Sequence, residues 1–389
     1  MFLVAVSGIV VLSSRVIIDN IMLLNSISVL NYRNLADVAL AFSGKINCFI
    51  GSNGMGKTNL LDAIYYLSFC KSALSAVDSS NIKHENPFFL IQGFYTSDSG
   101  IDSEISCGLK RGEKKQIKRN KKSYERFSEH IGTIPLVMVS PADNELIAGG
   151  SDERRRFMDV VISQYDREYL SALIRYNKSL AQRNVMLRAE YAPDAEMMSL
   201  MEDMMVVEAQ RVYEGRKRFV EELTPIFEEF HSYITGGNEK VSICYRSDVD
   251  DGNLGGLLLE SRVNDRRLGH TTKGVHRDEL LMQLDGYPIK KEGSQGQNKS
   301  YLVSLKLAQY DFLRRKGGET PLLLLDDIFD KLDSGRVEKI INLVAGDKFG
   351  QIFITDVNRE HIDGILEYIN GEYKLFGVTK GDITIIKER

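Results

Sequence analysis

The chain has 389 residues, of which 43% are hydrophobic and 27% are charged, and its formal net charge at pH 7 is −4. This length accommodates two or three compact units, or one domain with a large insertion, and the composition is that of a soluble globular protein. The acidic balance excludes a generally basic surface, so any nucleic-acid-binding surface must be a local patch. Its four cysteines lie far apart without a C-x-x-C pair, which favours neither a zinc site nor a disulfide framework and indicates a reducing cytosol.

Residues 1–21 form a stretch of their own. The part from Phe2 to Leu12 is mostly apolar, but no basic residue precedes it and it is too short to span a bilayer. Met22 stands directly before the first segment that alternates like a strand. We therefore interpret residues 1–21 as an extension or an upstream start outside the fold, and we expect a cytoplasmic protein without a membrane partner.

A glycine-rich stretch organises the N-terminal third. It reads Gly51-Ser52-Asn53-Gly54-Met55-Gly56-Lys57-Thr58 and fits G-x-x-x-x-G-K-[ST], the Walker A loop, at every fixed position. Residues 46–50 predict a buried strand before the loop, and apolar residues at helical spacing over 60–67 predict a helix after it. In that context the N–H groups of the loop point at phosphate oxygens, at the positive end of the helix. We expect a solvent-facing Lys57 to reach the β- and γ-phosphates of ATP and the Thr58 hydroxyl to ligate Mg²⁺, whereas a plain glycine turn is the alternative.

Short strand-like runs surround this loop. Residues 23–30 and 38–42 predict paired strands, joined by the polar turn Asn31-Tyr32-Arg33-Asn34. Further strands are predicted at 88–95, 105–109 and 134–139. These three later runs predict a small β-rich lobe.

Residues 110–122 are strongly basic. Eight of the thirteen residues are Lys or Arg and one is acidic. A hairpin tip with this charge attracts a polyanion, although charge runs also occur as merely solvated loops, and both interpretations stay open. The DNA-binding candidates in this segment are Lys114, Lys115, Lys118, Arg119, Lys121 and Lys122.

The pattern changes at Ser151, where Ser-Asp-Glu-Arg is typical of a capped helix start. Two apolar stripes at helical spacing predict long amphipathic helices over 151–234, interrupted at Ala192-Pro193-Asp194, with both stripes in the core. The first stripe consists of Leu170, Leu173, Ile174, Leu180 and Leu187, and the second of Phe219, Val220, Leu223, Ile226, Phe227 and Phe230. Residues 247–256, rich in Gly, Asp and Asn, predict a loop.

The C-terminal third again alternates strands and helices. Strands are predicted at 279–284, 321–327 and 351–355, and helices from Ser294 to about Arg315 and over 333–345. The order of strand, phosphate loop and helix, followed later by strand, two aspartates, helix and strand, is typical of an α/β nucleotide-binding sheet with ligands at the strand ends.

Asp326 and Asp327 end the predicted strand over 321–327. An apolar strand that ends in a carboxylate is a Walker B strand, and Asp326 is expected to hold Mg²⁺ together with Thr58. Asp327 is then placed to orient or deprotonate the attacking water. A solvated turn is the alternative, and the intact Walker A loop disfavours it. The candidate catalytic residues are therefore Lys57, Asp326 and Asp327.

Ser294-Gln295-Gly296-Gln297 decides between classes of P-loop protein. Short polar residues and glycine that open a helix can cradle phosphate. Because this tetrapeptide lies between Walker A and Walker B, it resembles the signature motif of ABC-type ATPases, where the signature of one subunit completes the ATP site of the other. The segment 329–333 resembles the D-loop of the same proteins. The resemblance implies that Ser294, Gly296 and Gln297 bind ATP across an ATP-dependent homodimer.

Within ABC-type ATPases, the chain resembles the RecF family of SMC-like proteins over nearly all of its length from Met22. The strings that carry this resemblance are Gly51-x-Asn53-Gly54-x-Gly56-Lys57-Thr58-Asn59-Leu60-Leu61, Arg154-Arg155-Arg156-Phe157-x-Asp159, Gly274-x-His276-Arg277-Asp278 and Ser294-Gln295-Gly296-Gln297. The implied fold is an α/β ABC-type ATPase head with a β-rich lobe, formed by residues 22–148 and 269–389, with a helical lobe inserted at 149–268.

The same resemblance implies a DNA replication and repair ATPase. It would clamp gapped or junction DNA, single- or double-stranded, as an ATP-driven dimer with slow, DNA-stimulated hydrolysis. It would cooperate with recombination mediators.

Several positions depart from the wider ABC pattern. Asp327 stands where the wider pattern has a catalytic glutamate. Val275 stands where a proline is expected after Gly274. The strand that ends at Asp356 has no histidine at the usual switch position. His361 follows it, but we expect it to lie too far along the chain to take that position. The Q-loop glutamine and the role of the Gly274–Asp278 string stay open, as does the place of Asn34 near the nucleotide.

Three other functions share these motifs. An ABC transporter ATPase is disfavoured by the long helical insertion and the basic segment. A nuclease-linked ATPase would need a further acidic metal-binding domain. The third function is an SMC-like DNA clamp that binds ATP without hydrolysing it. The short carboxylate of Asp327 favours this alternative.

Overall fold

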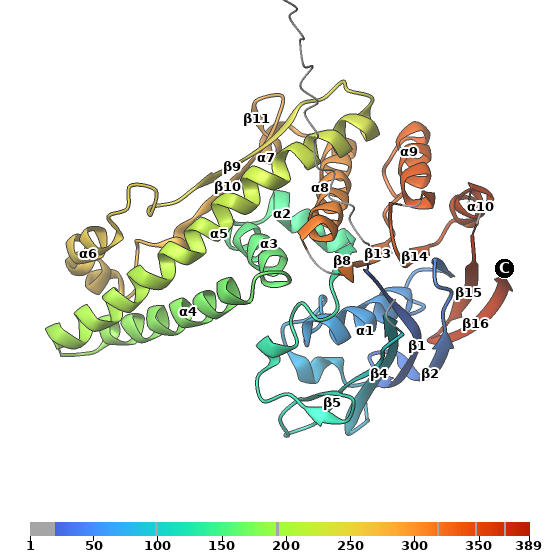
Figure 1. Ribbon diagram of the computed structural model, residues 1–389, viewed down its shortest axis with the longest axis horizontal. Helices are drawn as coiled ribbons and strands as arrows, with labels where there is room; N and C mark the ends of the chain where they lie inside the picture. The colour runs from blue at the N-terminus through green and yellow to red at the C-terminus, as the bar shows by residue number, and fades with distance from the viewer. Residues whose placement is uncertain (1–19, 98–99, 192–193, 317–318, 347, 369–370) are drawn as a thin grey trace, which may run out of the picture.

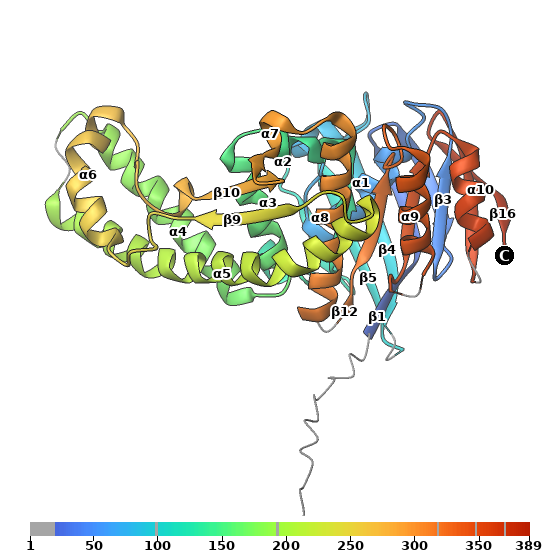
Figure 2. The ribbon, with the colours of Figure 1, turned by 90° about the horizontal axis from the view of Figure 1, so that it is seen from above.

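The computed structural model describes residues 20–97, 100–191, 194–316, 319–346, 348–368 and 371–389. These residues form a head, built around two sheets, and a long helical arm that projects from it (Figures 1 and 2). The expectation for the first 19 residues falls outside the described part of the chain. Residues 20 and 21, which we expected outside the fold, belong to the first strand and pair with residues 319 and 320.

A six-stranded sheet forms the centre of the head. Its order is β16-β15-β3-β14-β13-β8, and all neighbours are parallel except the edge pair β15 and β16. The strands are β3 (Ile46–Ile50), β8 (Leu136–Val139), β13 (Leu322–Asp326), β14 (Ile352–Asp356), β15 (Tyr373–Thr379) and β16 (Asp382–Glu388). The central strands are buried and mostly apolar, as expected for parallel strands covered on both faces. Its helices include α1 (Lys57–Phe69), α9 (Ser334–Ala345) and α10 (Arg359–Tyr368).

The second sheet of the head is the β-rich lobe. Its order is β12-β1-β4-β5-β6-β7, and β2 pairs with β1 off this path. The strands are β1 (Asn20–Tyr32), β2 (Leu35–Ala41), β4 (Phe88–Ser97), β5 (Asp102–Lys110), β6 (Gln116–Arg119), β7 (Lys122–Ser123) and β12 (Glu319–Thr320). The predicted strand over 134–139 does not belong here: β8 pairs in parallel with β13 in the central sheet. Its four residues are all buried, as a parallel strand requires, which a short apolar run alone does not reveal.

The arm consists of antiparallel helices beside a small sheet. Figure 1 shows α4 and α5 running side by side away from the head. The elements of the arm and its base are α2 (Asn144–Ala148), α3 (Ser151–Ser163), α4 (Arg167–Arg188), α5 (Ala195–Thr235), β9 (Val241–Arg246), α6 (Leu254–Leu268), β10 (Glu279–Leu284), β11 (Tyr287–Pro288) and α7 (Ile289–Glu292). Helix α8 (Gln295–Lys316) then returns the chain to the head. Strand β10 forms as predicted, but it pairs with β9 and β11 in the arm, so the head resumes only near residue 294.

The two predicted apolar stripes have different outcomes. The second, on α5, is buried at all six positions. The first is wrong for most of α4: Ile174 is 48% exposed and only Leu187 of the five is fully buried. Helix α4 instead buries a face of Tyr169, Ala172 and Tyr176 with further polar residues. The hydroxyls of Tyr169 and Tyr176 form hydrogen bonds inside the arm. The prediction missed this face because it considered only Leu and Ile at helical spacing.

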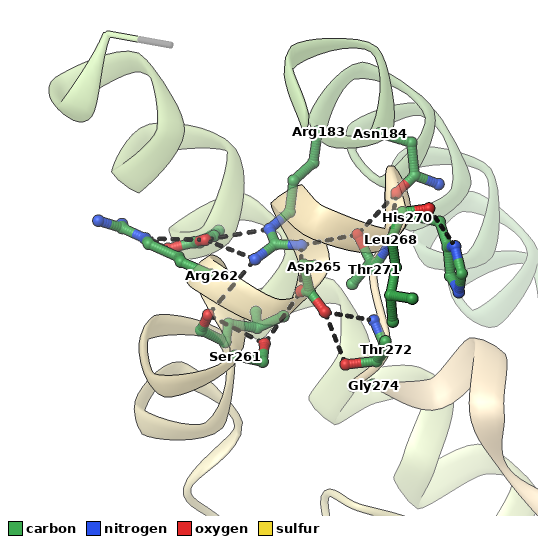
Figure 3. Close-up of polar contacts among 12 residues, drawn as sticks. Arg183, Asn184, Ser261, Arg262, Asp265, Leu268, His270, Thr271, Thr272 and Gly274 are labelled. Carbon is green, nitrogen blue, oxygen red and sulfur yellow. Dashed lines mark hydrogen bonds and ion pairs between the residues drawn. The ribbon is translucent and has the colours of Figure 1, made fainter. Parts of the chain in front are cut away.

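A buried ionic cluster holds the far end of the arm together (Figure 3). The guanidinium of Arg183 on α4 is fully buried and lies 2.7 Å from Asp265 on α6 and 3.0 Å from Glu202 on α5. Arg183 also donates to the Thr271 hydroxyl, and Thr272 donates to Asp265. Burial alone would raise the pKa of Asp265, but the hydrogen bonds that it accepts outweigh burial and lower it. Arg183 thus joins three helices through one side chain.

Candidate nucleotide-binding site

The glycine-rich loop connects β3 to α1 at the carboxyl edge of the central sheet. Gly56 has φ 113°, and a side chain there would approach the Asn34 amide to 2.8 Å. At Gly51 a side chain would lie 2.4 Å from the Val378 carbonyl oxygen. Asn59 of α1 donates to the Asn34 side chain at 2.8 Å. The polar turn at 31–34 therefore lies against the loop, and both glycines are needed because neighbouring segments leave no room for Cβ.

Lys57 is buried within the loop. Its Nζ donates to the carbonyl oxygens of Gly51, at 2.6 Å, and Ser52, at 3.2 Å, and the residue is 4% exposed. The expectation of a solvent-facing lysine is therefore wrong. The loop curls back over the ammonium group, so the positive charge lies against the carbonyl oxygens at the start of the loop.

Thr58 and Asp326 meet at the end of β13. Thr58 Oγ1 donates to Asp326 Oδ1 at 3.0 Å, and Thr355 Oγ1 on the neighbouring strand β14 donates to the same oxygen at 2.6 Å. Burial raises the pKa of Asp326, while these hydrogen bonds act in the opposite direction. A hydroxyl and a carboxylate that converge in this way are the hard oxygen donors that Mg²⁺ prefers, so the residues fit that ion.

Asp327 is held in an unusual backbone conformation. Its φ is 45°, and its N–H lies 3.2 Å from Thr355 Oγ1 and 3.3 Å from the Thr355 carbonyl oxygen. Its Oδ1 is buried and has no hydrogen-bond partner among the described residues. Burial, and then the adjacent Asp326 carboxylate, raises the pKa of Asp327. A poised carboxylate with an unused acceptor is what activation of a water molecule requires.

A cavity of about 740 Å³ opens beside these residues. Asn53 of the glycine-rich loop, Asp327 and His361 all line it. His361 lies on α10, and its Nδ1 is 2.9 Å from Asp356 Oδ2. The expectation that His361 lies too far along the chain is therefore wrong, since the first turn of α10 folds back to the strand ends.

The loop after β8 is a part of this cavity that the sequence analysis missed. Pro141 and Asn144 of this loop line the cavity together with His361. Ser140 begins this loop with a capping box in which its backbone N–H donates to Asp143. Ser-x-x-Asp is a recognisable start signal, and it could have indicated the turn.

Ser294 and Gln297 form the same kind of reciprocal cap at the start of α8. Ser294 N donates to Gln297 Oε1 at 3.0 Å and Gln297 N donates to Ser294 Oγ at 3.3 Å. In the described residues no hydrogen bond joins Ser294, Gly296 or Gln297 to the glycine-rich loop, although Gln295 between them lines the same cavity as Asn53. Ser294 is exposed and available to another molecule.

Arg336 of α9 ties this cap to the base of the arm. It donates to Ser300 Oγ at 2.5 Å and to Glu239 Oε1 at 2.9 Å, and Glu239 follows α5 in the chain. Glu239 also contacts Gln297 and His231. The start of α8 and the end of α5 therefore share one polar network.

The basic hairpin has two kinds of lysine. Lys114, Lys121 and Lys122 are exposed, and Lys118 and Arg119 are half-buried. Lys115 is different: its Nζ donates to the Cys70 carbonyl oxygen at 2.6 Å and pairs with Asp78 at 2.7 Å. As a DNA-binding candidate Lys115 is not supported, because it anchors the hairpin to the end of α1.

The Gly274–Asp278 string has a structural place in the arm. Asp278 is buried and accepts from Arg216 at 2.7 Å, while His276 Nδ1 lies 2.7 Å from the Tyr176 hydroxyl. Burial lowers the pKa of His276 to about 4. Arg216 in turn binds Asp159, so two of the strings that we singled out in the sequence meet in one buried cluster.

None of the helices in the described part of the chain is both long and apolar enough to cross a membrane. The family described as RecF/RecN/SMC N terminal domain matches residues 23–380. A protein of Phocaeicola vulgatus called DNA replication and repair protein RecF is 62% identical over 368 residues, which cover 94% of this chain and 99% of the relative. A protein of the same description from Bacteroides thetaiotaomicron is 60% identical over 362 residues, covering 93% and 98%.

Solved structures agree with these relatives. A recombination mediator protein described as RecF-ATP in the RecFOR pathway superposes with a TM-score of 0.85 at 29% identity, covering 94% of this chain and 100% of that one. Another, described as RecF-ATPrS, gives 0.84 at 29% identity, covering 95% and 99%. An Smc head domain from Pyrococcus furiosus gives 0.57 at 15% identity over 95% and 96%, which shows a shared fold.

Proposed function

Because this chain belongs to the RecF proteins of the RecF/RecN/SMC N-terminal domain family, we propose that it is an ATPase of DNA replication and recombinational repair. Two copies would enclose ATP between them, and this dimer would clamp gapped or junction DNA. One observation carries the proposal: Lys57, Thr58 and Asp326 converge at the strand ends, while the exposed cap at Ser294 makes no hydrogen bond to them among the described residues.

Each residue has a distinct task in this proposal. Lys57 would exchange its two carbonyl partners for the β- and γ-phosphates, with the loop N–H groups around them. Thr58 and Asp326 would hold Mg²⁺, which neutralises phosphate charge when bound. Asp327 would accept a hydrogen bond from the attacking water through its unused oxygen. Ser294, Gly296 and Gln297 would bind the phosphates of the partner's ATP.

Slow hydrolysis is part of the proposal. Asp327 has one methylene less than the glutamate of the wider ABC pattern, and its backbone is fixed by Thr355. A shorter carboxylate on a fixed backbone reaches the water less well, and positioning errors of this size reduce rates strongly. A clamp that binds ATP without hydrolysis is the second candidate, and the same residue favours it.

Sedimentation velocity tests the proposal. The protein is measured alone, with ATP and Mg²⁺, and with both in the presence of a gapped DNA duplex. We expect monomers alone, dimers with ATP, and a dimer–DNA complex in the third sample. Dimers that form equally without nucleotide would contradict the shared site, and release of phosphate separates an ATPase from the second candidate.

DNA contact is assigned to the exposed lysines of the hairpin. Lys114, Lys121 and Lys122 lie on the outer edge of the β-rich lobe, and the overall charge of −4 means that no general positive surface competes with them. Their contacts would be to phosphates and hence independent of base sequence. Cooperation with recombination mediators is proposed here without an assigned surface; a solved relative is itself described as a recombination mediator protein in the RecFOR pathway.

A further inference from the structure

A second cavity lies where the head meets the base of the arm. Its volume is about 440 Å³, and it shares no lining residue with the cavity at the strand ends. The end of α1 contributes one wall, and α3 and α4 contribute the others. No step of the proposed ATPase uses it.

The walls of this cavity are largely apolar. Phe69 of α1 faces Val160 of α3 and the half-buried Leu170 and Leu173 of α4 across it. These two leucines belong to the α4 stripe that the sequence placed in the core. Leu173 also packs against the core of the arm, as does Leu180, so the stripe serves both the core and the cavity.

Three cations gather at the same cavity. Lys71 makes no hydrogen bond or ion pair in the described residues, and its pKa is lowered by partial burial and then by Arg156 and Lys115. Arg155 donates one hydrogen bond, to the Asp278 carbonyl oxygen. Arg156 pairs with Glu153 at 3.1 Å, and Arg216, which also lines the cavity, binds Asp159. With Asp152 as the other acidic lining residue, the lining cations outnumber the lining carboxylates by four to two.

Two neutral polar side chains are also unused. Ser163 is 6% exposed and lines the cavity, yet it has no hydrogen-bond partner among the described residues. Asn177 of α4 lines the cavity as well, and this residue is exposed. A polar serine beside lining cations is the chemistry of a site for an anionic ligand.

We propose that this cavity holds one unpaired nucleotide of a DNA strand, with its base between the apolar walls and its phosphate on Lys71, Arg155 and Arg156. The inference rests on the proposed function, since it names the part of the DNA that the head–arm junction reads. Apolar surface for a base beside cations for the backbone is the combination that binds single strands. A paired base within a duplex cannot enter a cavity of this size without leaving its stack.

The basic hairpin leads directly to this cavity. Lys115 binds the carbonyl of Cys70, the residue before Lys71. Lys114, the exposed neighbour of Lys115 in the chain, is therefore close to the residues that lead into the cavity. This continuity favours DNA over an acidic peptide with an aromatic side chain, which has similar chemistry.

The test uses the full-length protein and a gapped DNA with 2-aminopurine as the first unpaired base. One variant, Lys71→Gln with Arg156→Gln, removes charge, and a second, Ser163→Leu, fills the cavity. Lys178→Gln on the exposed face of α4 is the matched control. We expect both variants to lose affinity for gapped DNA by roughly tenfold, with blunt duplex affinity within about twofold and the fluorescence change lost in Ser163→Leu.

ATP affinity reports on folding in each variant, because the two cavities share no residue. Equal losses on gapped and blunt DNA would overturn the inference in favour of a general phosphate surface. Unchanged affinity in both variants would overturn it too, as would an acidic peptide that displaces the fluorescence signal without displacing the DNA. If the wild type binds no DNA of any form, it is the proposed function that fails.

Discussion

The strand-end site and the far end of the arm both bury charge, but they treat it differently. At the arm tip Arg183 meets Asp265, Glu202 and Thr271, and the carboxylates find further donors (Figure 3). At the strand ends Asp327 keeps a buried oxygen without a partner, and Lys57 is satisfied only by carbonyls of its own loop. A buried polar network with every partner in place holds structure, whereas groups left over identify where a ligand belongs.

Removing the lysine of the strand-end site should have the largest effect. Lys57→Ala is expected to abolish measurable ATP binding, because the central positive charge of the loop is lost. Isothermal titration with ATP measures this, and circular dichroism checks the fold, since two loop hydrogen bonds are lost as well. ATP binding at wild-type strength by folded Lys57→Ala would refute the site.

The carboxylate beside it should affect turnover alone. Asp327→Asn is expected to bind ATP and form dimers while hydrolysis falls by about 10²-fold or more, because only the water-orienting group changes. Phosphate release under single-turnover conditions is the measurement. Equal rates for Asp327→Asn and the wild type would assign activation of the water to another group.

The trans role of Ser294 can be separated from both. Ser294→Arg should spare ATP binding by the monomer and block dimers, since a large cation would occupy the exposed cap. Mixing Ser294→Arg with Lys57→Ala protein leaves one intact composite site per heterodimer. Restored hydrolysis is expected in the mixture, and its absence in confirmed heterodimers would argue against shared sites.

A substitution at the arm tip is expected to change stability and not ATP binding. Arg183→Met should lower the free energy of unfolding by about 3–5 kcal/mol, because Asp265 is left as a buried charge without its main partner. ATP affinity should not change. Urea unfolding gives the stability, and a loss of under 1 kcal/mol would mean that water or Arg262 replaces the guanidinium.

The buried histidine of the arm gives a smaller, pH-dependent effect. The pKa of His276 is lowered to about 4 in the folded chain, so only the unfolded chain takes up its proton near the ordinary value of 6.5. Stability is therefore lost as the pH falls from about 6.5 to about 4, by at most about 3 kcal/mol. His276→Gln should flatten this dependence in urea unfolding at pH 7 and pH 5, and an identical pH dependence in the variant would contradict it.

Much of the site followed from the sequence because its motifs are local. The glycine-rich loop, the strand that ends in Asp326 and the cap at Ser294 each need only neighbouring residues, and all of them form where expected. Three other features depend on contacts between distant segments. They are the pairing of β8 with β13, the position of His361 beside Asp356, and the hydrogen bond of Lys115 to Cys70. Those contacts leave no periodic signal in a single sequence.

Helix α5 has a mechanical consequence. Its 41 residues make a rod of about 60 Å, with one end at the Arg183 cluster and the other next to Glu239 and Arg336. A rod of this length moves its far end by about 1 Å for each degree of rotation at its base. Any tilt that begins at the cap of α8 is therefore magnified at the tip of the arm.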